Sequence, residues 1–113
     1  MIKIYHNPRC QKSREGLQLL ESTGEFIQVI KYLDDVPTEA ELTEIIKTLG
    51  ITPIELVRTK EDIWKQKYKD LKLNDQEIIK AMVENPKLIE RPIVIKDKVA
   101  VIGRPLENIK AIL

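Results

Sequence analysis

Residues 6–10, HNPRC, contain the only histidine and the only cysteine of a chain of 113 residues. A cysteine is a nucleophile only as the thiolate, and an ordinary thiol pKa of about 8.5 leaves only a few per cent ionised at pH 7. Basic residues stand close to Cys10 on both sides, at Arg9, Lys12 and Arg14. Since nearby positive charge stabilises a thiolate, we expect Cys10 to have a lowered pKa and to be a reactive nucleophile.

His6 and Ser13 could assist this cysteine. His6 could act as a cation or as a hydrogen-bond donor beside the thiolate, but a purely structural role is equally open. The hydroxyl of Ser13 can also donate. A lone cysteine is more often a small buried apolar residue, but the turn-forming pair Asn7-Pro8 and the polar flanks are not a core pattern.

The spacing around Cys10 excludes two familiar chemistries. A CxxC dithiol would need a cysteine at position 13, where the chain has Ser13. A tyrosine-phosphatase loop would need an arginine at the sixth position after the cysteine, which is Gly16. One cysteine allows no intrachain disulfide, and with one histidine it supplies too few soft ligands for a metal site.

Three arginines elsewhere in the chain could bind an oxyanion. Arg58 follows Leu56-Val57, Arg91 precedes a proline, and Arg104 precedes another. The guanidinium group is a rigid fork of charged donors that suits tetrahedral anions. Each arginine taken alone is more readily an ordinary surface residue, whereas two Arg-Pro pairs that flank a predicted hairpin are a weak indication of a shared role.

The elements around Cys10 follow a strand-helix-strand pattern. Residues 1–5 alternate as a strand, and Asn7-Pro8 ends it. A helix is predicted from about residue 11 to Thr23-Gly24, and residues 26–32 are rich in β-formers. Cys10 therefore falls at a helix N-terminus, where free N–H groups and the helix dipole favour a thiolate or a bound anion.

The rest of the chain is predicted to be helical first and then to form a hairpin. Capping boxes open helices at residues 38–50, 52–55 and 74–83, and residues 60–72 are expected to form an amphipathic surface helix over the pocket. A β-hairpin follows at residues 92–102, and then a helix at 105–113. The order predicts an α/β, thioredoxin-like fold with a mixed sheet and helices on both faces.

The domain organisation follows from the same order. We expect one domain, residues 1–113, in which residues 1–35 and 86–113 form the thioredoxin-like core and residues 36–85 are a helical insertion. In this fold the proline that opens the third strand follows a cis bond, so the fold analogy makes Arg91-Pro92 a candidate cis peptide.

Composition restricts the class of partner. The chain has 19 basic and 18 acidic residues, which gives no electrostatic reason to expect nucleic acid or membrane binding. No apolar run approaches the roughly 20 residues of a membrane span, and the first residues are not a secretory signal. With a single cysteine, these features favour a reducing, cytoplasmic setting.

Four segments resemble the glutaredoxin-dependent arsenate reductase family, also called the ArsC family. They are IYHNPRCQKSR (4–14), LVR ending at Arg58, ENPKLIERPIVI (84–95) and IGRP (102–105), and they follow in order over nearly the whole chain. The resemblance implies the thioredoxin-like fold and an enzyme that reduces arsenate to arsenite through a thiolate–arsenate adduct on Cys10.

The resemblance also implies a set of site residues. The catalytic residues would be Cys10, Arg58, Arg91 and Arg104. The supporting, anion-binding residues would be His6, Asn7, Ser13 and Arg14, with His6 keeping the cysteine ionised.

The expected reductants come from outside the chain. The resemblance implies that glutathione, or another low-molecular-weight thiol, attacks the adduct and that glutaredoxin takes up the mixed disulfide. This agrees with a single cysteine, since no second thiol of the chain can resolve the adduct. We expect no bound cofactor or metal, and a monomer.

Two other functions stay open at this point. Spx-like regulators, a related branch, bind RNA polymerase instead of reducing arsenate, but they commonly carry a CxxC motif that Ser13 interrupts here. The other is a thiol oxidoreductase that acts on mixed disulfides without arsenate.

Overall fold

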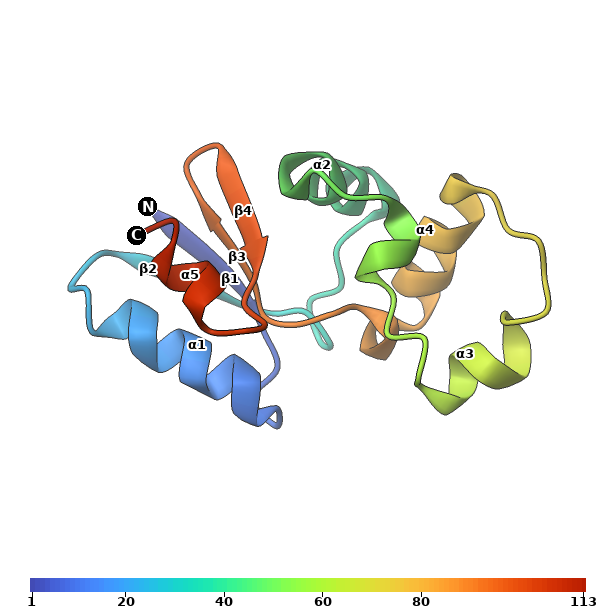
Figure 1. The fold of residues 1–113 in the computed structure, drawn as a ribbon, viewed down its shortest axis with the longest axis horizontal. Coiled ribbons are helices and arrows are strands. Elements are labelled where there is room, and N and C mark those ends of the chain that lie inside the picture. Colours follow the sequence, from blue (N-terminus) through green and yellow to red (C-terminus); the bar gives the residue numbers. More distant parts are fainter. The chain divides into compact units, whose positions relative to one another are not determined.

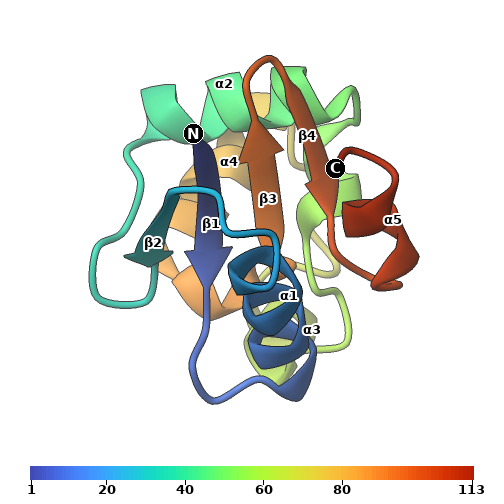
Figure 2. The same ribbon diagram turned by 90° about the vertical axis from the view of Figure 1, so that its left-hand side faces the viewer.

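A four-stranded mixed sheet, in the order β2-β1-β3-β4, organises the part of the chain that carries Cys10 (Figures 1 and 2). β1 (Ile2–His6) pairs in parallel with β2 (Ile27–Lys31) and antiparallel with β3 (Ile93–Lys96). β3 in turn pairs antiparallel with β4 (Val99–Ile102). The computed structural model describes all residues 1–113, and it confirms the α/β, thioredoxin-like mixed sheet.

The chain divides into two compact units, which we call the sheet unit (1–35 and 91–113) and the helical unit (36–90). The sequence-based division placed residues 86–90 with the sheet. They belong to the helical unit because their backbone bonds lead there: Ile89 bridges to Val57, and the Arg58 N–H donates to the Leu88 carbonyl at 2.7 Å.

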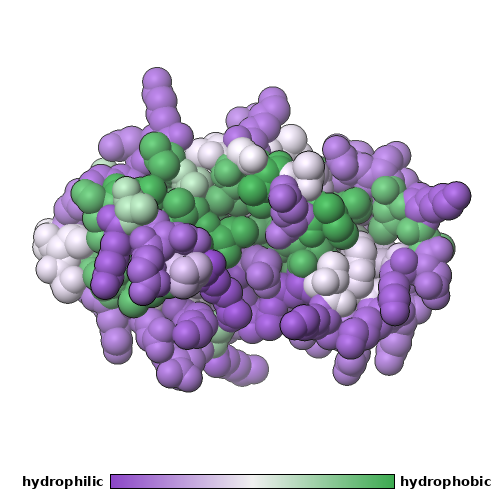
Figure 3. Space-filling view, viewed as in Figure 1, coloured by the Kyte–Doolittle hydropathy of each residue, from purple (hydrophilic) through white to green (hydrophobic).

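Helix α1 (Gln11–Glu21) begins directly after Cys10, which is its N-cap residue with extended backbone angles, φ −98° and ψ 123°. Gly16 and Leu20 are buried on one side of the helix, and Figure 3 shows a mainly hydrophilic surface over α1. This amphipathic pattern directs one side of α1 to the sheet. Cys10 lies in the connection between β1 and α1.

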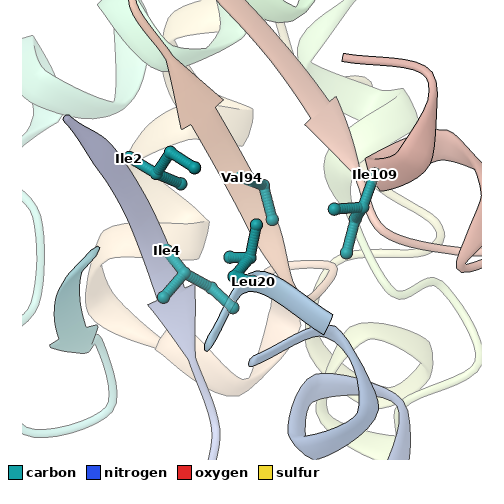
Figure 4. Packing of buried hydrophobic residues seen from close by; sticks show 5 residues of the cluster. All are labelled: Ile2, Ile4, Leu20, Val94 and Ile109. Carbon is teal, nitrogen blue, oxygen red and sulfur yellow. The ribbon is translucent and has the colours of Figure 1, made fainter. Parts of the chain in front are cut away.

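The core of the sheet unit lies between the sheet and its two helices. Ile2 and Ile4 of β1 and Val94 of β3 pack with Leu20 of α1 and Ile109 of α5 (Glu107–Lys110), and all five are fully buried (Figure 4). Burying such a side chain contributes roughly 1.5–3 kcal/mol. Within the sheet unit, both helices therefore cover the same face of the sheet.

The closing helix is shorter than the predicted helix at 105–113. α5 spans only Glu107–Lys110. Beyond it, the amides of Ile112 and Leu113 bond three residues back, to the carbonyls of Ile109 and Lys110. Such tightened turns are common where a helix frays at its end. The β-hairpin has the expected place, with Asp97 at φ 55° in its turn.

The helical unit contains three helices and two short 3-10 turns. α2 (Glu39–Leu49) and α4 (Asp75–Glu84) each begin at a complete capping box, with Thr38 and Asn74 as N-cap residues. The predicted helix at 52–55 is a 3-10 turn, η1 (Pro53–Leu56), and a second turn, η2 (Pro86–Leu88), follows α4. No helix is both long and apolar enough to cross a membrane.

Residues 60–72 do not form one surface helix. α3 covers only Asp62–Lys67, and the amides of Tyr68 and Lys69 both bond to the Trp64 carbonyl, which ends the helix. The Trp64 side chain is buried, and its ring stacks on Tyr68 at 5.5 Å between centroids. The amphipathic pattern therefore predicted a longer helix than α3, which ends where two successive amides share the Trp64 carbonyl.

Candidate active site

Cys10 is held at the N-terminus of α1 with its side chain almost buried. Its exposed fraction is 8%. The Arg104 Nη2 donates a hydrogen bond to Cys10 Sγ at 3.3 Å. The Arg91 guanidinium and the Ser13 backbone N–H also bond to the sulfur. The thiol therefore has three donors around it, two of them cationic.

These donors decide the ionisation of Cys10. Burial of the thiol raises its pKa, but the hydrogen bonds from Arg91, the Ser13 N–H and Arg104 outweigh burial and lower the pKa to about 7. Roughly half of the cysteine is then a thiolate at pH 7, against a few per cent for an ordinary thiol. The two nearest cations come from the far end of the chain, whereas the sequence suggested Arg9 and Lys12 beside the cysteine.

Ser13 is fully buried and joins Cys10 to His6. The Ser13 hydroxyl accepts from the Asn7 N–H at 3.0 Å and lies 2.7 Å from His6 Nδ1. Burial and the charge of Lys31 lower the pKa of His6, so its imidazole is neutral at pH 7. The unprotonated Nδ1 of a neutral imidazole can accept a hydrogen bond from the Ser13 hydroxyl, and the single ring proton is then on Nε2.

This arrangement differs from the sequence-based expectation for His6. The histidine bonds to Ser13, and it is neutral where a cation was considered. Ser13 therefore lies between His6 and Cys10, and a role of His6 in keeping the cysteine ionised stays a prediction.

Asn7 and Arg14 brace the turn that leads to Cys10. The Asn7 Oδ1 accepts from the Arg9 N–H at 3.0 Å, and its carbonyl accepts from the Cys10 N–H at 3.0 Å. The Arg14 Nη1 donates to the Pro8 carbonyl at 3.1 Å. Both side chains thus bond to the turn itself, and their roles in binding an anion stay predictions.

Arg91 and Arg104 are bonded to each other as well as to the sulfur. The Arg104 Nε donates to the Arg91 carbonyl at 2.8 Å. The Arg91 Nε is buried and has no hydrogen-bond partner within the protein. A buried donor without a partner is costly, and an anion oxygen at the site would satisfy it.

Both arginines precede a proline in a cis peptide bond. The Arg91–Pro92 bond was the candidate from the fold analogy and is cis. The Arg104–Pro105 bond is cis as well, and no pattern in the sequence pointed to it.

Arg58 belongs to the helical unit, where acidic partners bind its side chain. Its Nε lies 3.3 Å from a Glu90 carboxylate oxygen, and its Nη1 lies 4.0 Å from Glu61. The grouping around Cys10 described here therefore contains Arg91 and Arg104 of the sheet unit. Neither partner was predicted from the sequence; the i,i+3 spacing of Arg58 and Glu61 is a local signal for such a pair, whereas Glu90 lies far along the chain.

This arrangement can support nucleophilic attack by the Cys10 thiolate on an anion bound beside it. A thiolate, two guanidinium groups and the N-terminus of an eleven-residue helix meet in one place. No group of three or more His, Cys, Asp or Glu side chains forms a metal site.

Known proteins with similar sequences match this chain over nearly its whole length. An arsenate reductase of Neisseria meningitidis is 45% identical over 114 residues, which cover 99% of this chain and 97% of that protein. An arsenate reductase of Haemophilus influenzae is 46% identical, with coverage of 99% and 98%. The solved structure of an arsenate reductase from Vibrio cholerae, 46% identical, has a TM-score of 0.93 and covers 99% of this chain and 97% of its own. The ArsC family model matches residues 5–112, and the chain therefore belongs to the ArsC family.

Proposed function

We propose that this protein is an arsenate reductase that uses Cys10 as its nucleophile and an external thiol as its reductant. The observation that carries the proposal is the Cys10 thiol, buried at a helix N-terminus and bonded by Arg91 and Arg104, with a pKa lowered to about 7. Relatives at 45% and 46% identity bear the name arsenate reductase, which supports arsenate as the oxyanion.

In the first step the Cys10 thiolate attacks arsenic. A sulfur–arsenic bond forms, and one arsenate oxygen leaves as water after it takes up protons. The arginine pair stabilises the charge that gathers on the remaining oxygens, and the unpaired Arg91 Nε is one donor available for them. Arg58 is proposed as a third cation for the oxyanion or its product.

In the second step an external thiol reduces the adduct. The thiol attacks Cys10 Sγ, the sulfur–arsenic bond breaks, and its electron pair stays with arsenic, which becomes As(III). A mixed disulfide with Cys10 is left, and another thiol must reduce it. Because Cys10 is the only cysteine, both thiols come from other molecules, and we propose glutathione and glutaredoxin in the cytoplasm, with the enzyme as a monomer.

His6, Asn7, Ser13 and Arg14 serve this site as supporting residues in the proposal. Ser13 binds the thiolate through its backbone N–H, and His6 and the Asn7 amide hold the Ser13 hydroxyl. The role of Asn7 and Arg14 is to keep the turn at residues 7–10 in the shape that aims Cys10 at the anion.

A coupled assay tests the function. Arsenate is added to the protein with glutathione, glutaredoxin, glutathione reductase and NADPH, and NADPH oxidation is followed. Wild-type protein should turn over, whereas Cys10→Ser should not, because the covalent step is lost. Turnover no greater than that of Cys10→Ser, with glutathione and with other low-molecular-weight thiols alike, would reject the proposal.

A further inference from the structure

Two glycines of the sheet unit lie where a side chain does not fit, and both face Pro92. A Cβ atom on Gly16 would lie 3.1 Å from Pro92 Cγ and 3.0 Å from Ile109 Cδ1. A Cβ atom on Gly103 would lie 2.9 and 2.7 Å from the same two atoms. Carbon atoms in contact lie about 3.5–4.0 Å apart, so either methyl group would force a neighbour to move.

Backbone conformation does not explain these two glycines. The glycines with positive φ are Gly24 and Gly50, each of which has open space where a Cβ would lie. Gly16 lies inside α1, where alanine is intrinsically the better helix former. What Gly16 and Gly103 provide is therefore room for a close neighbour.

Pro92, the close neighbour of both glycines, is connected to the cysteine site through the backbone. The Gly103 N–H donates to the Pro92 carbonyl at 2.8 Å. Arg91 directly precedes Pro92, and Arg104 directly follows Gly103. Gly16 lies on the helix whose N-cap is Cys10. Pro92 therefore connects through the backbone to both arginines, and it packs against the helix that begins at Cys10.

We propose that Gly16 and Gly103 are positioning residues for the proposed reaction, on which this inference rests: without side chains, they let Pro92 approach α1 closely enough for Arg91 and Arg104 to bond to Cys10 Sγ. The arginines act on the sulfur, and the glycines act through Pro92.

The two neighbours would respond differently to an added methyl group. Ile109 Cδ1 is the end of a flexible side chain and can turn aside. Pro92 Cγ belongs to a ring, so the Pro92 backbone has to shift, by roughly half an ångström at Gly103→Ala and slightly less at Gly16→Ala. The Arg104–Sγ hydrogen bond is 3.3 Å long, and a shift of this size weakens it.

The experiment measures thiolate absorbance near 240 nm against pH in Gly103→Ala and Gly16→Ala. Both variants should raise the Cys10 midpoint, Gly103→Ala by about 0.5–1 pH unit and Gly16→Ala by less, since a nearby cation typically lowers a pKa by 1–3 units. Gly24→Ala is the matched control, because it strains the backbone of the same unit but meets nothing within 4 Å. Its midpoint should equal that of the wild type.

Thermal unfolding separates positioning from loss of structure. Gly16→Ala should melt within a few degrees of the wild type, since a gain in helix propensity offsets the crowding. If Gly103→Ala does not fold, the ionisation midpoint of Cys10 in Gly16→Ala tests the inference. Midpoints within 0.2 unit of the wild type, or an equal rise in Gly24→Ala, would overturn the inference. This readout needs no arsenate, so a wild type without arsenate turnover would reject the proposed function and leave the midpoint result standing.

Discussion

Replacing Arg104 by glutamine removes one cation from beside the Cys10 sulfur and keeps an uncharged side chain that can still donate hydrogen bonds. Arg104 makes the 3.3 Å bond to Cys10 Sγ and a 2.8 Å bond to the Arg91 carbonyl. Loss of a cation at this distance should raise the Cys10 pKa by about 1 unit, which corresponds to about 1.4 kcal/mol. The thiolate at pH 7 would fall from roughly half to about a tenth of the protein.

The choice of assay follows from these magnitudes. A thiol with a higher pKa is a better nucleophile when ionised, with a Brønsted coefficient of about 0.4–0.5. The roughly fivefold loss of thiolate is then offset by a threefold gain in reactivity, so alkylation at pH 7 should slow only about twofold. Absorbance near 240 nm against pH reports the midpoint directly and is the better measurement.

Two further variants sharpen the comparison. Arg104→Lys keeps the charge, but one ammonium group cannot reach both former partners as a planar fork does, so its midpoint should lie between wild type and Arg104→Gln. Arg9→Gln removes a charge next to Cys10 from an exposed side chain and should have the smaller effect. A midpoint in folded Arg104→Gln that does not rise, or rises no more than in Arg9→Gln, would refute the reasoning.

Three other predictions concern the same unit. The folded-state pKa of Cys10 lies below that of the unfolded chain, so the thiolate should stabilise the fold fully above pH 9, by about 2 kcal/mol, and this stabilisation should disappear as the pH falls through 7. Urea unfolding at pH 6 and pH 9 should show a larger difference in wild type than in Cys10→Ser, which keeps only the smaller change from the lowered pKa of His6; equal differences in the two proteins would contradict the prediction. His6→Ala removes the acceptor of the buried Ser13 hydroxyl and should cost about 1–3 kcal/mol in urea unfolding, with a smaller rise of the Cys10 midpoint than Arg104→Gln causes; an equal or larger rise would show that His6 acts on the thiol directly. Leu20→Ala leaves a cavity in the core and should cost about 2–5 kcal/mol by the same method, and a cost below 1 kcal/mol would contradict its place there.

Local signals in the sequence predicted the elements that have clear boundaries. The capping boxes at Thr38 and Asn74 marked the starts of α2 and α4, because a cap depends on residues three positions apart. Short or terminal helices were predicted less well. α3 and α5 are both shorter than the predicted helices, because the hydrogen bonds that end a helix do not follow from the periodicity of its apolar residues.

Residues 86–90 show the same limit at a unit boundary. Asn85-Pro86 ends α4, and a helix end suggested the end of the insertion. Backbone pairing of Ile89 with Val57 keeps the segment in the helical unit. Such pairing joins residues far apart in the chain, so local patterns carry no trace of it.

The sequence by itself determined where Cys10 lies and predicted it as the nucleophile. One cysteine, a proline that ends the first strand and a helical pattern that starts at the next residue are all local, and together they predict Cys10 at a helix N-terminus. Only the tertiary structure decided which groups ionise it. Cys10 and Arg104 are 94 positions apart, and they meet because the order of the strands and the close packing of Pro92 on Gly16 and Gly103 bring both arginines to the sulfur. Hydrogen-bond geometry between such distant residues depends on ångström-scale packing, which residue types and spacing do not encode locally.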